Sequence, residues 1–124
     1  MEHLIIEQSK NTLGVEFDPH TGEFSMEGSS FPENTFDFFS PIISLLEKYM
    51  LEKTEKLTVD FKFDYLNSSS IKFISDIIDK LQIYYNSGGK VELNWYYYSD
   101  DDDILEMGEE FKEDVDFIFN IHKI

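Results

Sequence analysis

The sequence predicts an α/β fold with a mixed β-sheet, on three observations. The chain has 124 residues, enough for one hydrophobic core and too few for two. Its first third contains short stretches in which apolar and polar residues alternate, as they do in strands. In the rest of the chain, segments with the apolar spacing of a helix alternate with segments that have the spacing of a strand. Strands that alternate with helices favour parallel pairing. We therefore expect one domain over residues 1–124, with an N-terminal antiparallel hairpin followed by alternating α and β units.

The N-terminal third is predicted to form three short strands. Leu4–Ile6 is a brief apolar run, and Gly14–Asp18 and Gly22–Gly28 alternate between apolar and polar residues. The segment Asp18–Gly22 contains Pro and Gly and is typical of a hairpin turn. The last two strands are therefore expected to pair as a hairpin.

The next segment is predicted to be a helix with one buried face. Asn34 or Thr35 is a suitable N-cap, because its side chain can accept a hydrogen bond from a free backbone N–H. Pro41 is unfavourable inside a helix, and a helix beginning with Ser40 as its cap is the alternative. We expect one helix with a kink at Pro41. Its apolar face contains Phe36, Phe39, Ile42, Ile43, Leu46, Tyr49 and Met50.

Strands and helices are predicted to alternate through the rest of the chain. The second helix should end at Ser87–Gly89, since Gly is common after a helix C-terminus. The predicted elements are a strand at Lys56–Phe63, a helix at 71–85, a strand at Val91–Tyr98, a short acidic helix at Asp103–Asp114 and a strand at Phe117–Ile121.

The charge of the chain excludes several kinds of partner. There are 26 acidic and 10 basic residues, every basic residue is Lys, and the formal net charge is -16. Nucleic acid and anionic membrane surfaces are therefore not expected partners. No apolar run approaches the roughly 18 residues of a membrane span, and the N-terminus lacks the pattern of a secretory signal. We expect a soluble cytoplasmic protein that is a monomer when free.

Catalytic and metal-binding patterns are absent from the sequence. There is no Cys, and His3, His20 and His122 do not have the spacing of helical metal ligands. Asp100–Asp103 lacks the alternating ligands and central Gly of a calcium loop, and favours a helix N-terminus instead. We expect no metal, no cofactor and no enzymatic activity.

The stretch from residue 100 to 116 is the candidate acidic docking face. It contains many carboxylates and a single basic residue, Lys112. Such a face would suit a basic partner, while the simpler interpretation is that the charge serves solubility.

Ser68, Ser69 and Ser70 form the most informative cluster, between a predicted strand and a predicted helix. One of them is expected to cap the helix. A hydroxyl at this place is also suited to reversible phosphorylation, because free amides at a helix N-terminus can hold a phosphate. The cluster therefore predicts either a simple cap or a phosphoswitch.

Four segments occur in an order and spacing that match one bacterial family: Phe24–Gly28, Phe31–Asn34, Tyr65–Ile71 and Glu109–Asp114. In combination they resemble the SiaC-type regulatory phosphoproteins over nearly the whole chain. The resemblance implies a non-enzymatic switch protein with a fold similar to anti-sigma-factor antagonists (STAS-like).

The resemblance also implies a set of partners. In the family, a serine/threonine kinase of the histidine-kinase-like ATPase type modifies a hydroxyl residue after an Asn, and a metal-dependent serine phosphatase removes the phosphate. The unmodified protein binds and activates a diguanylate cyclase, which raises cyclic di-GMP and promotes aggregation or biofilm formation.

Carried over to this sequence, the modified hydroxyl is Ser68, with Ser69 and Ser70 as alternatives. Members of the family have Thr at this place, so the sequence departs from the pattern but keeps the hydroxyl. Pro32–Asn34 has a structural interpretation as well, as a helix entry with Asn as cap. The partner-binding residues implied are Tyr65, Leu66, Asn67, Ser69, Lys72, Pro32, Glu33 and Asn34.

Two other functions remain open from the sequence. One is an anti-sigma-factor antagonist that acts on transcription, because a shared fold does not decide which partner is regulated. The other is an acidic decoy that binds a basic protein, whose complex should weaken steeply as ionic strength rises.

Overall fold

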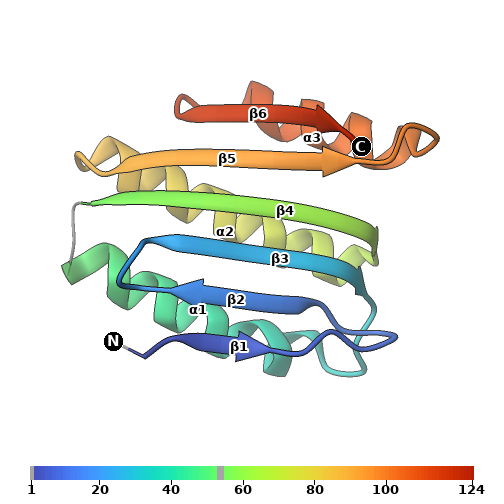
Figure 1. Cartoon of the computed structure of the whole chain (residues 1–124), viewed down its shortest axis with the longest axis horizontal. Coiled ribbons are helices and arrows are strands. Elements are labelled where there is room, and N and C mark those ends of the chain that lie inside the picture. Colours follow the sequence, from blue (N-terminus) through green and yellow to red (C-terminus); the bar gives the residue numbers. More distant parts are fainter. Residues whose placement is uncertain (1, 53–54) are drawn as a thin grey trace.

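Six strands form one mixed sheet in the computed structural model, which describes residues 2–52 and 55–124. They lie side by side in the order in which they occur in the chain (Figure 1). The strands are β1 (Leu4–Ile6), β2 (Gly14–Asp18), β3 (Glu23–Ser30), β4 (Lys56–Leu66), β5 (Lys90–Tyr97) and β6 (Ile118–Lys123).

The pairing of the strands changes from antiparallel to parallel along the sheet. β1, β2 and β3 pair antiparallel, whereas β3, β4, β5 and β6 pair parallel. The hairpin turn closes where the Asp18 carboxylate accepts the His20 N–H at 2.9 Å and Gly22 takes a φ of 74°. The predicted mixed sheet with its N-terminal hairpin is therefore confirmed.

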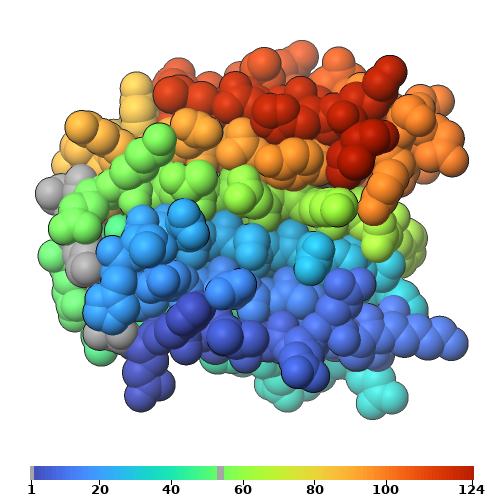
Figure 2. Space-filling view, in the orientation of Figure 1, coloured from blue at the N-terminus to red at the C-terminus, as the bar shows by residue number. Residues whose placement is uncertain are grey.

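Three helices connect the parallel strands and cover one face of the sheet. They are α1 (Thr35–Glu52), α2 (Ser68–Asn86) and α3 (Asp102–Glu113). Each parallel connection moves one strand in the same direction, so right-handed crossovers place all three helices on the same side. Figure 1 shows this layer behind the sheet, and Figure 2 shows the opposite face, which no helix covers.

The N-cap of α1 agrees with the sequence, but Phe36, which was predicted to lie on the buried face, is 64% exposed in the first turn. The Asn34 side chain accepts the Asp37 N–H at 3.0 Å, so Asn34 rather than Thr35 is the N-cap. Pro41 lies inside α1 on its exposed side. One helix spans both sides of Pro41, and no new helix begins at Ser40.

The start of α2 corrects the sequence-based expectation. Asn67, and not one of the serines, is the N-cap, because its side-chain oxygen accepts the Ser70 N–H at 2.9 Å. Asn67 has extended backbone angles typical of a cap, while Ser68 is already helical. At the other end Ser87 follows the helix and Gly88 has a φ of 102°, as expected for a Gly terminator.

The core lies between the helices and the covered face of the sheet. Phe24 and Phe61 meet edge to face at 5.9 Å, and Trp95 is fully buried. The Trp95 indole N–H donates to the Ile104 carbonyl at 2.9 Å. A Cβ on Gly108 would lie 2.5 Å from the Trp95 ring, so this glycine lets α3 lie directly on the indole.

Several element boundaries differ from the prediction. β3 continues to Ser30 and β4 to Leu66, beyond the stretches in which apolar and polar residues alternate. Both strands extend this far because they still pair with each other at these residues. β6 begins at Ile118 and ends at Lys123, one to two residues later than expected. Within the described residues, no helix is long and apolar enough to cross a membrane.

Candidate functional site

Two segments that are far apart in the sequence meet where β3 and β4 end. The connection from β3 to α1 and the connection from β4 to α2 lie at the same edge, at the right-hand ends of these strands in Figure 1. We call residues 30–36 and 64–72 the serine edge. It contains every partner-binding and phosphorylation residue that the sequence suggested.

Two buried serines fix the base of the serine edge. Ser30 and Ser70 are both fully buried, and their hydroxyls are hydrogen-bonded at 2.7 Å. The Ser70 hydroxyl also donates to the Ser30 carbonyl at 3.2 Å, and the Asn67 N–H donates to the same carbonyl at 3.0 Å. The end of β3 is thereby joined to the first turn of α2.

Ser69 joins the two connections near the surface. Its exposed hydroxyl is hydrogen-bonded to the Thr35 hydroxyl at 2.8 Å and donates to the Asn67 side chain at 3.2 Å. Thr35 is the first residue of α1. The two helix N-termini are therefore held at a fixed spacing.

Ser68 differs from both of its neighbours. It is exposed, it is the first residue of α2, and its hydroxyl has no hydrogen bond to any other residue that the structure describes. Lys72 is exposed one helical turn later, at the i+4 position of the same face. Of the three adjacent hydroxyls, that of Ser68 alone is both exposed and without a hydrogen bond among the described residues.

A β-bulge turns Tyr65 outward. The pairs Gly28–Phe63 and Ser29–Tyr65 are consecutive on β3, so β4 carries one extra residue between them, Asp64. Strict alternation from buried Phe63 would bury Tyr65, yet Tyr65 is 54% exposed. Its ring lies edge to face with exposed Phe31 at 6.1 Å.

Two of the suggested residues do not fit their expected role. Leu66 is buried and belongs to the core, because the bulge returns it to the covered face. Ser70 is fully buried, so a kinase cannot reach it in the folded chain. Pro32 is half-buried, Glu33 is exposed, and Asn34 caps α1, as the helix-entry interpretation predicts.

Comparison with known proteins places this arrangement in one family. A family model described as SiaC family regulatory phosphoprotein matches residues 6–124. The chain belongs to the SiaC family. An uncharacterized protein of Pseudomonas aeruginosa (strain UCBPP-PA14) is 36% identical over 121 residues, which cover 98% of this chain and 96% of the relative.

Solved structures of the family agree over the whole fold. SiaC of Pseudomonas aeruginosa is 35% identical and superposes with a TM-score of 0.94, with 100% of both chains covered. A crystal structure of the diguanylate cyclase SiaD in complex with its activator SiaC, from the same organism, matches with a TM-score of 0.93 and 35% identity, over 98% of this chain and 99% of that one. The expected family and fold class are confirmed, and SiaC-family proteins are regulators rather than enzymes.

Sequence reasoning missed three contributors to the serine edge of this SiaC-family chain. Ser30 and Thr35 hold the first turn of α2, and Phe31 contacts Tyr65. Ser30 lies 40 residues from Ser70, and no local pattern indicates their contact. The parallel pairing of β3 with β4 brings Ser30 and Ser70 together.

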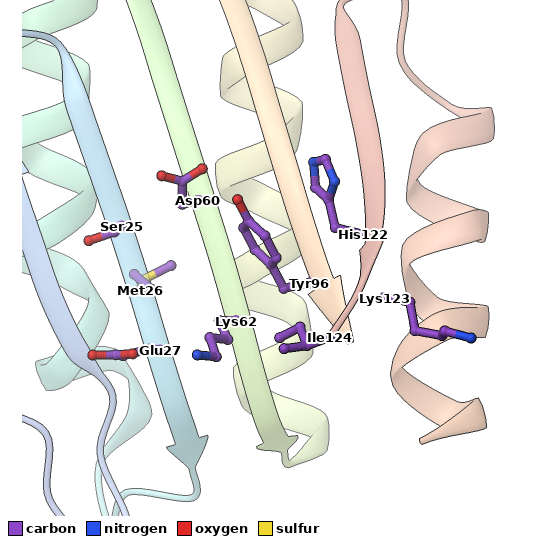
Figure 3. Close-up of a pocket in the computed structure, with 9 residues that line it drawn as sticks. All are labelled: Ser25, Met26, Glu27, Asp60, Lys62, Tyr96, His122, Lys123 and Ile124. Carbon is purple, nitrogen blue, oxygen red and sulfur yellow. The ribbon is translucent and has the colours of Figure 1, made fainter. Parts of the chain in front are cut away.

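A separate hollow of about 550 Å³ lies on the uncovered face of the sheet and shares no lining residue with the serine edge (Figure 3). Tyr96 stacks on His122 at 4.9 Å, and His122 is hydrogen-bonded to Asn94 at 2.9 Å. Charges of both signs line it, and among the described residues no group of His, Asp and Glu could hold a metal ion. The lining residues are Ser25, Met26, Glu27, Asp60, Lys62, Tyr96, His122, Lys123 and Ile124.

The acidic stretch forms α3 and its flanks. Asp101 caps the helix by accepting the Ile104 N–H at 3.1 Å, and Asp102 and Asp103 occupy the first turn. These carboxylates lie at the positive end of the helix dipole. The helix-start interpretation of the four consecutive aspartates is therefore confirmed.

Proposed function

We propose that this chain is a partner-switching protein whose unmodified form binds and activates a diguanylate cyclase and whose phosphorylation at Ser68 releases the cyclase. One observation carries the assignment to Ser68: its hydroxyl is exposed and free of hydrogen bonds within the described residues, at the start of α2. The complex of the related SiaC with SiaD supports a cyclase as the effector. The cellular outcome is control of cyclic di-GMP, and with it aggregation or biofilm formation.

The switch needs two further enzymes. A serine/threonine kinase of the histidine-kinase-like ATPase type transfers the γ-phosphoryl group of ATP to the Ser68 oxygen, releasing ADP and the hydroxyl proton. A metal-dependent serine phosphatase hydrolyses the ester and restores the hydroxyl. Since the kinase reaction draws on the ATP of the cell interior, the proposal also implies that the protein acts in the cytoplasm.

The effect of the phosphate follows from charge. Modification adds about -1.5 to -2 charges at neutral pH, to a chain whose formal net charge is already -16. Free amides of the first turn of α2 and the Lys72 ammonium are the groups of this chain best placed to meet it. A dianion at the centre of a protein interface is costly unless the partner supplies cations.

Ser69 is the alternative acceptor. Its hydroxyl is exposed, but it is already hydrogen-bonded to Thr35 and Asn67. Phosphorylation of Ser69 would have to break the contact between α1 and α2, whereas phosphorylation of Ser68 breaks none within the described residues.

The test compares cyclase binding by unmodified protein, Ser68-phosphorylated protein, Ser68→Ala and Ser68→Asp. We expect unmodified protein and Ser68→Ala to bind with similar affinity and to raise cyclic di-GMP synthesis. The phosphorylated protein should bind at least about tenfold more weakly, with Ser68→Asp as a partial copy. Ser44→Ala, at an exposed position in the middle of α1 and outside the serine edge, is the matched control and should behave like the wild type.

Equal affinity for all four forms would contradict the switch at Ser68. Intact-mass measurement of protein from its native cells, with fragments across residues 65–72, independently locates any phosphate. Capture of an anti-sigma kinase in place of a cyclase would assign the chain to transcription instead.

A further inference from the structure

Three exposed aromatic rings lie on the two connections that form the serine edge. Phe31 is 41% exposed and Tyr65 is 54% exposed, and they lie edge to face at 6.1 Å. Phe36, next to Thr35 in the first turn of α1, is 64% exposed. Large rings are usually buried, so three exposed rings at one edge of a small protein indicate an interaction surface.

Contacts within the fold keep the rings of Tyr65 and Phe31 in exposed positions. The extra residue Asp64 in β4 rotates Tyr65 away from the core, at the cost of regular pairing. The Phe31 N–H donates to the Asn11 carbonyl at 2.9 Å, which fixes the backbone of the second ring. The hydroxyl contact between Thr35 and Ser69 ties both connections into one surface. Such prior ordering lowers the entropy that binding must overcome.

Charges lie beside the rings. Glu33, Asp37, Asp64 and Lys72 are all exposed and follow or precede the rings in the sequence. Lys72 is the only cation of the serine edge, and it is one turn from Ser68. The surface therefore combines apolar rings with a mainly anionic border.

We propose that Phe31 and Tyr65, with Phe36 beside them, are the anchor that inserts into an apolar surface of the cyclase, and that phosphate at Ser68 prevents this insertion chiefly because the dianion cannot be dehydrated there. This inference rests on the proposed function and names the chemistry of its interface. The occupant is the cyclase because the rings are continuous with the turn that bears the switch hydroxyl.

The physical reason is the difference between a hydroxyl and a phosphate in an apolar contact. A serine hydroxyl can be covered at modest cost when the partner supplies one hydrogen bond, whereas a dianion that Lys72 and the helix amides neutralise only in part must stay hydrated. Water that stays bound to the phosphate at Ser68 also prevents the neighbouring rings from packing against the partner. Aromatic anchors contribute most to affinity where water is excluded around them. A local dehydration effect does not depend on ionic strength, unlike repulsion between separated charges.

The first experiment measures the affinity of a purified diguanylate cyclase of the source organism for Phe31→Ala, Tyr65→Ala and Tyr65→Phe. We expect each alanine variant to bind at least about tenfold more weakly, and Tyr65→Phe to bind within about threefold of the wild type, because the ring and not the hydroxyl makes the contact.

Tyr85→Ala is the matched control. Tyr85 is 39% exposed and contacts the Phe117 ring at 6.4 Å, but it lies near the other end of α2. Its loss should leave the affinity unchanged. Wild-type affinity in both Phe31→Ala and Tyr65→Ala, while the wild type itself binds, would overturn the anchor and leave the proposed function standing. Failure of the wild type to bind any cyclase would instead overturn the proposed function.

The second experiment separates dehydration from repulsion with the isosteric pair Ser68→Asp and Ser68→Asn. We expect the Asp variant to bind more weakly than the Asn variant, by a ratio that changes less than about twofold between 50 mM and 500 mM NaCl. A ratio that falls towards one as salt is added would show long-range repulsion and overturn the dehydration mechanism. Equal loss in both variants would show that bulk alone breaks the contact, and would overturn it as well.

Discussion

At the scale of single residues, three adjacent serines have three different environments. Ser70 is buried against Ser30, Ser69 is hydrogen-bonded to Thr35, and Ser68 is exposed. Successive helical residues point about 100° apart, so one faces the core, one the neighbouring helix and one the solvent. Because Asn67 caps the helix, none of the three hydroxyls is needed for that role.

Asn67→Ala should therefore destabilise the protein, while Ser68→Ala should not. Loss of the cap is expected to lower the free energy of unfolding by about 1 kcal/mol. Ser68→Ala should change it by less than about 0.5 kcal/mol. Urea unfolding monitored by circular dichroism measures both, and Asn67→Asp, which keeps the accepting oxygen, is the control. A larger loss in Ser68→Ala than in Asn67→Ala would contradict the assignment of the cap.

At the scale of elements, the contact of α3 with the sheet depends on one glycine. Gly108 is buried against the Trp95 ring, and the indole N–H donates to the Ile104 carbonyl one turn earlier in α3. The predicted acidic helix is confirmed as an element. Its charge pattern did not indicate that a glycine is needed where the helix packs on Trp95.

Gly108→Ala should destabilise the protein although Ala is the better helix former. Ala gains about 1 kcal/mol in helix propensity, but its Cβ would lie 2.5 Å from the indole. Overpacking of this kind costs about 1–3 kcal/mol, with displacement of α3 as the alternative. Unfolding followed by the fluorescence of Trp95, the single Trp of the chain, reports both effects. Glu109→Ala, at an exposed position of α3, is the control, and greater stability of Gly108→Ala would contradict the close contact.

At the scale of the whole molecule, two tyrosines join the helical layer to the start of β4. The Tyr84 hydroxyl donates to the Glu55 carbonyl, and the Tyr49 hydroxyl donates to the Lys56 carbonyl at 3.5 Å. Burial, with smaller contributions from Tyr49 and Glu55, raises the pKa of Tyr84 from 10.0 to about 12. Burial also raises the pKa of Tyr49.

Stability should therefore fall in alkaline solution. Between pH 10 and about 12 the unfolded chain loses the Tyr84 proton while the folded chain keeps it, so the free energy of unfolding decreases as pH rises. This contribution is fully present below pH 10, and its loss amounts to about 3 kcal/mol at most. Urea unfolding from pH 9 to 11.5 should show a shallower decline in Tyr84→Phe than in the wild type. Tyr98→Phe, at an exposed position, is the control, and identical slopes in all three proteins would contradict the prediction.

The sequence by itself determined the types and order of the elements, because periodicity and turn residues act locally. The alternation in Lys56–Phe63 and the Gly residues after α2 each predicted a correct element. Charge is also a property of composition, so the expectation that nucleic acid is not a partner rests on the sequence alone. The family followed from segments whose order and spacing are visible in the chain.

Only the tertiary structure decided how deep each residue of the serine edge lies. Leu66 and Ser70 follow exposed neighbours in the sequence, and the bulge at Asp64 and the contact with Ser30 bury them. The pairing of β3 with β4 decides both, and it joins residues about 40 positions apart. A local sequence pattern cannot predict such a contact, since the burial of a side chain depends on which distant segments of the chain pack over it.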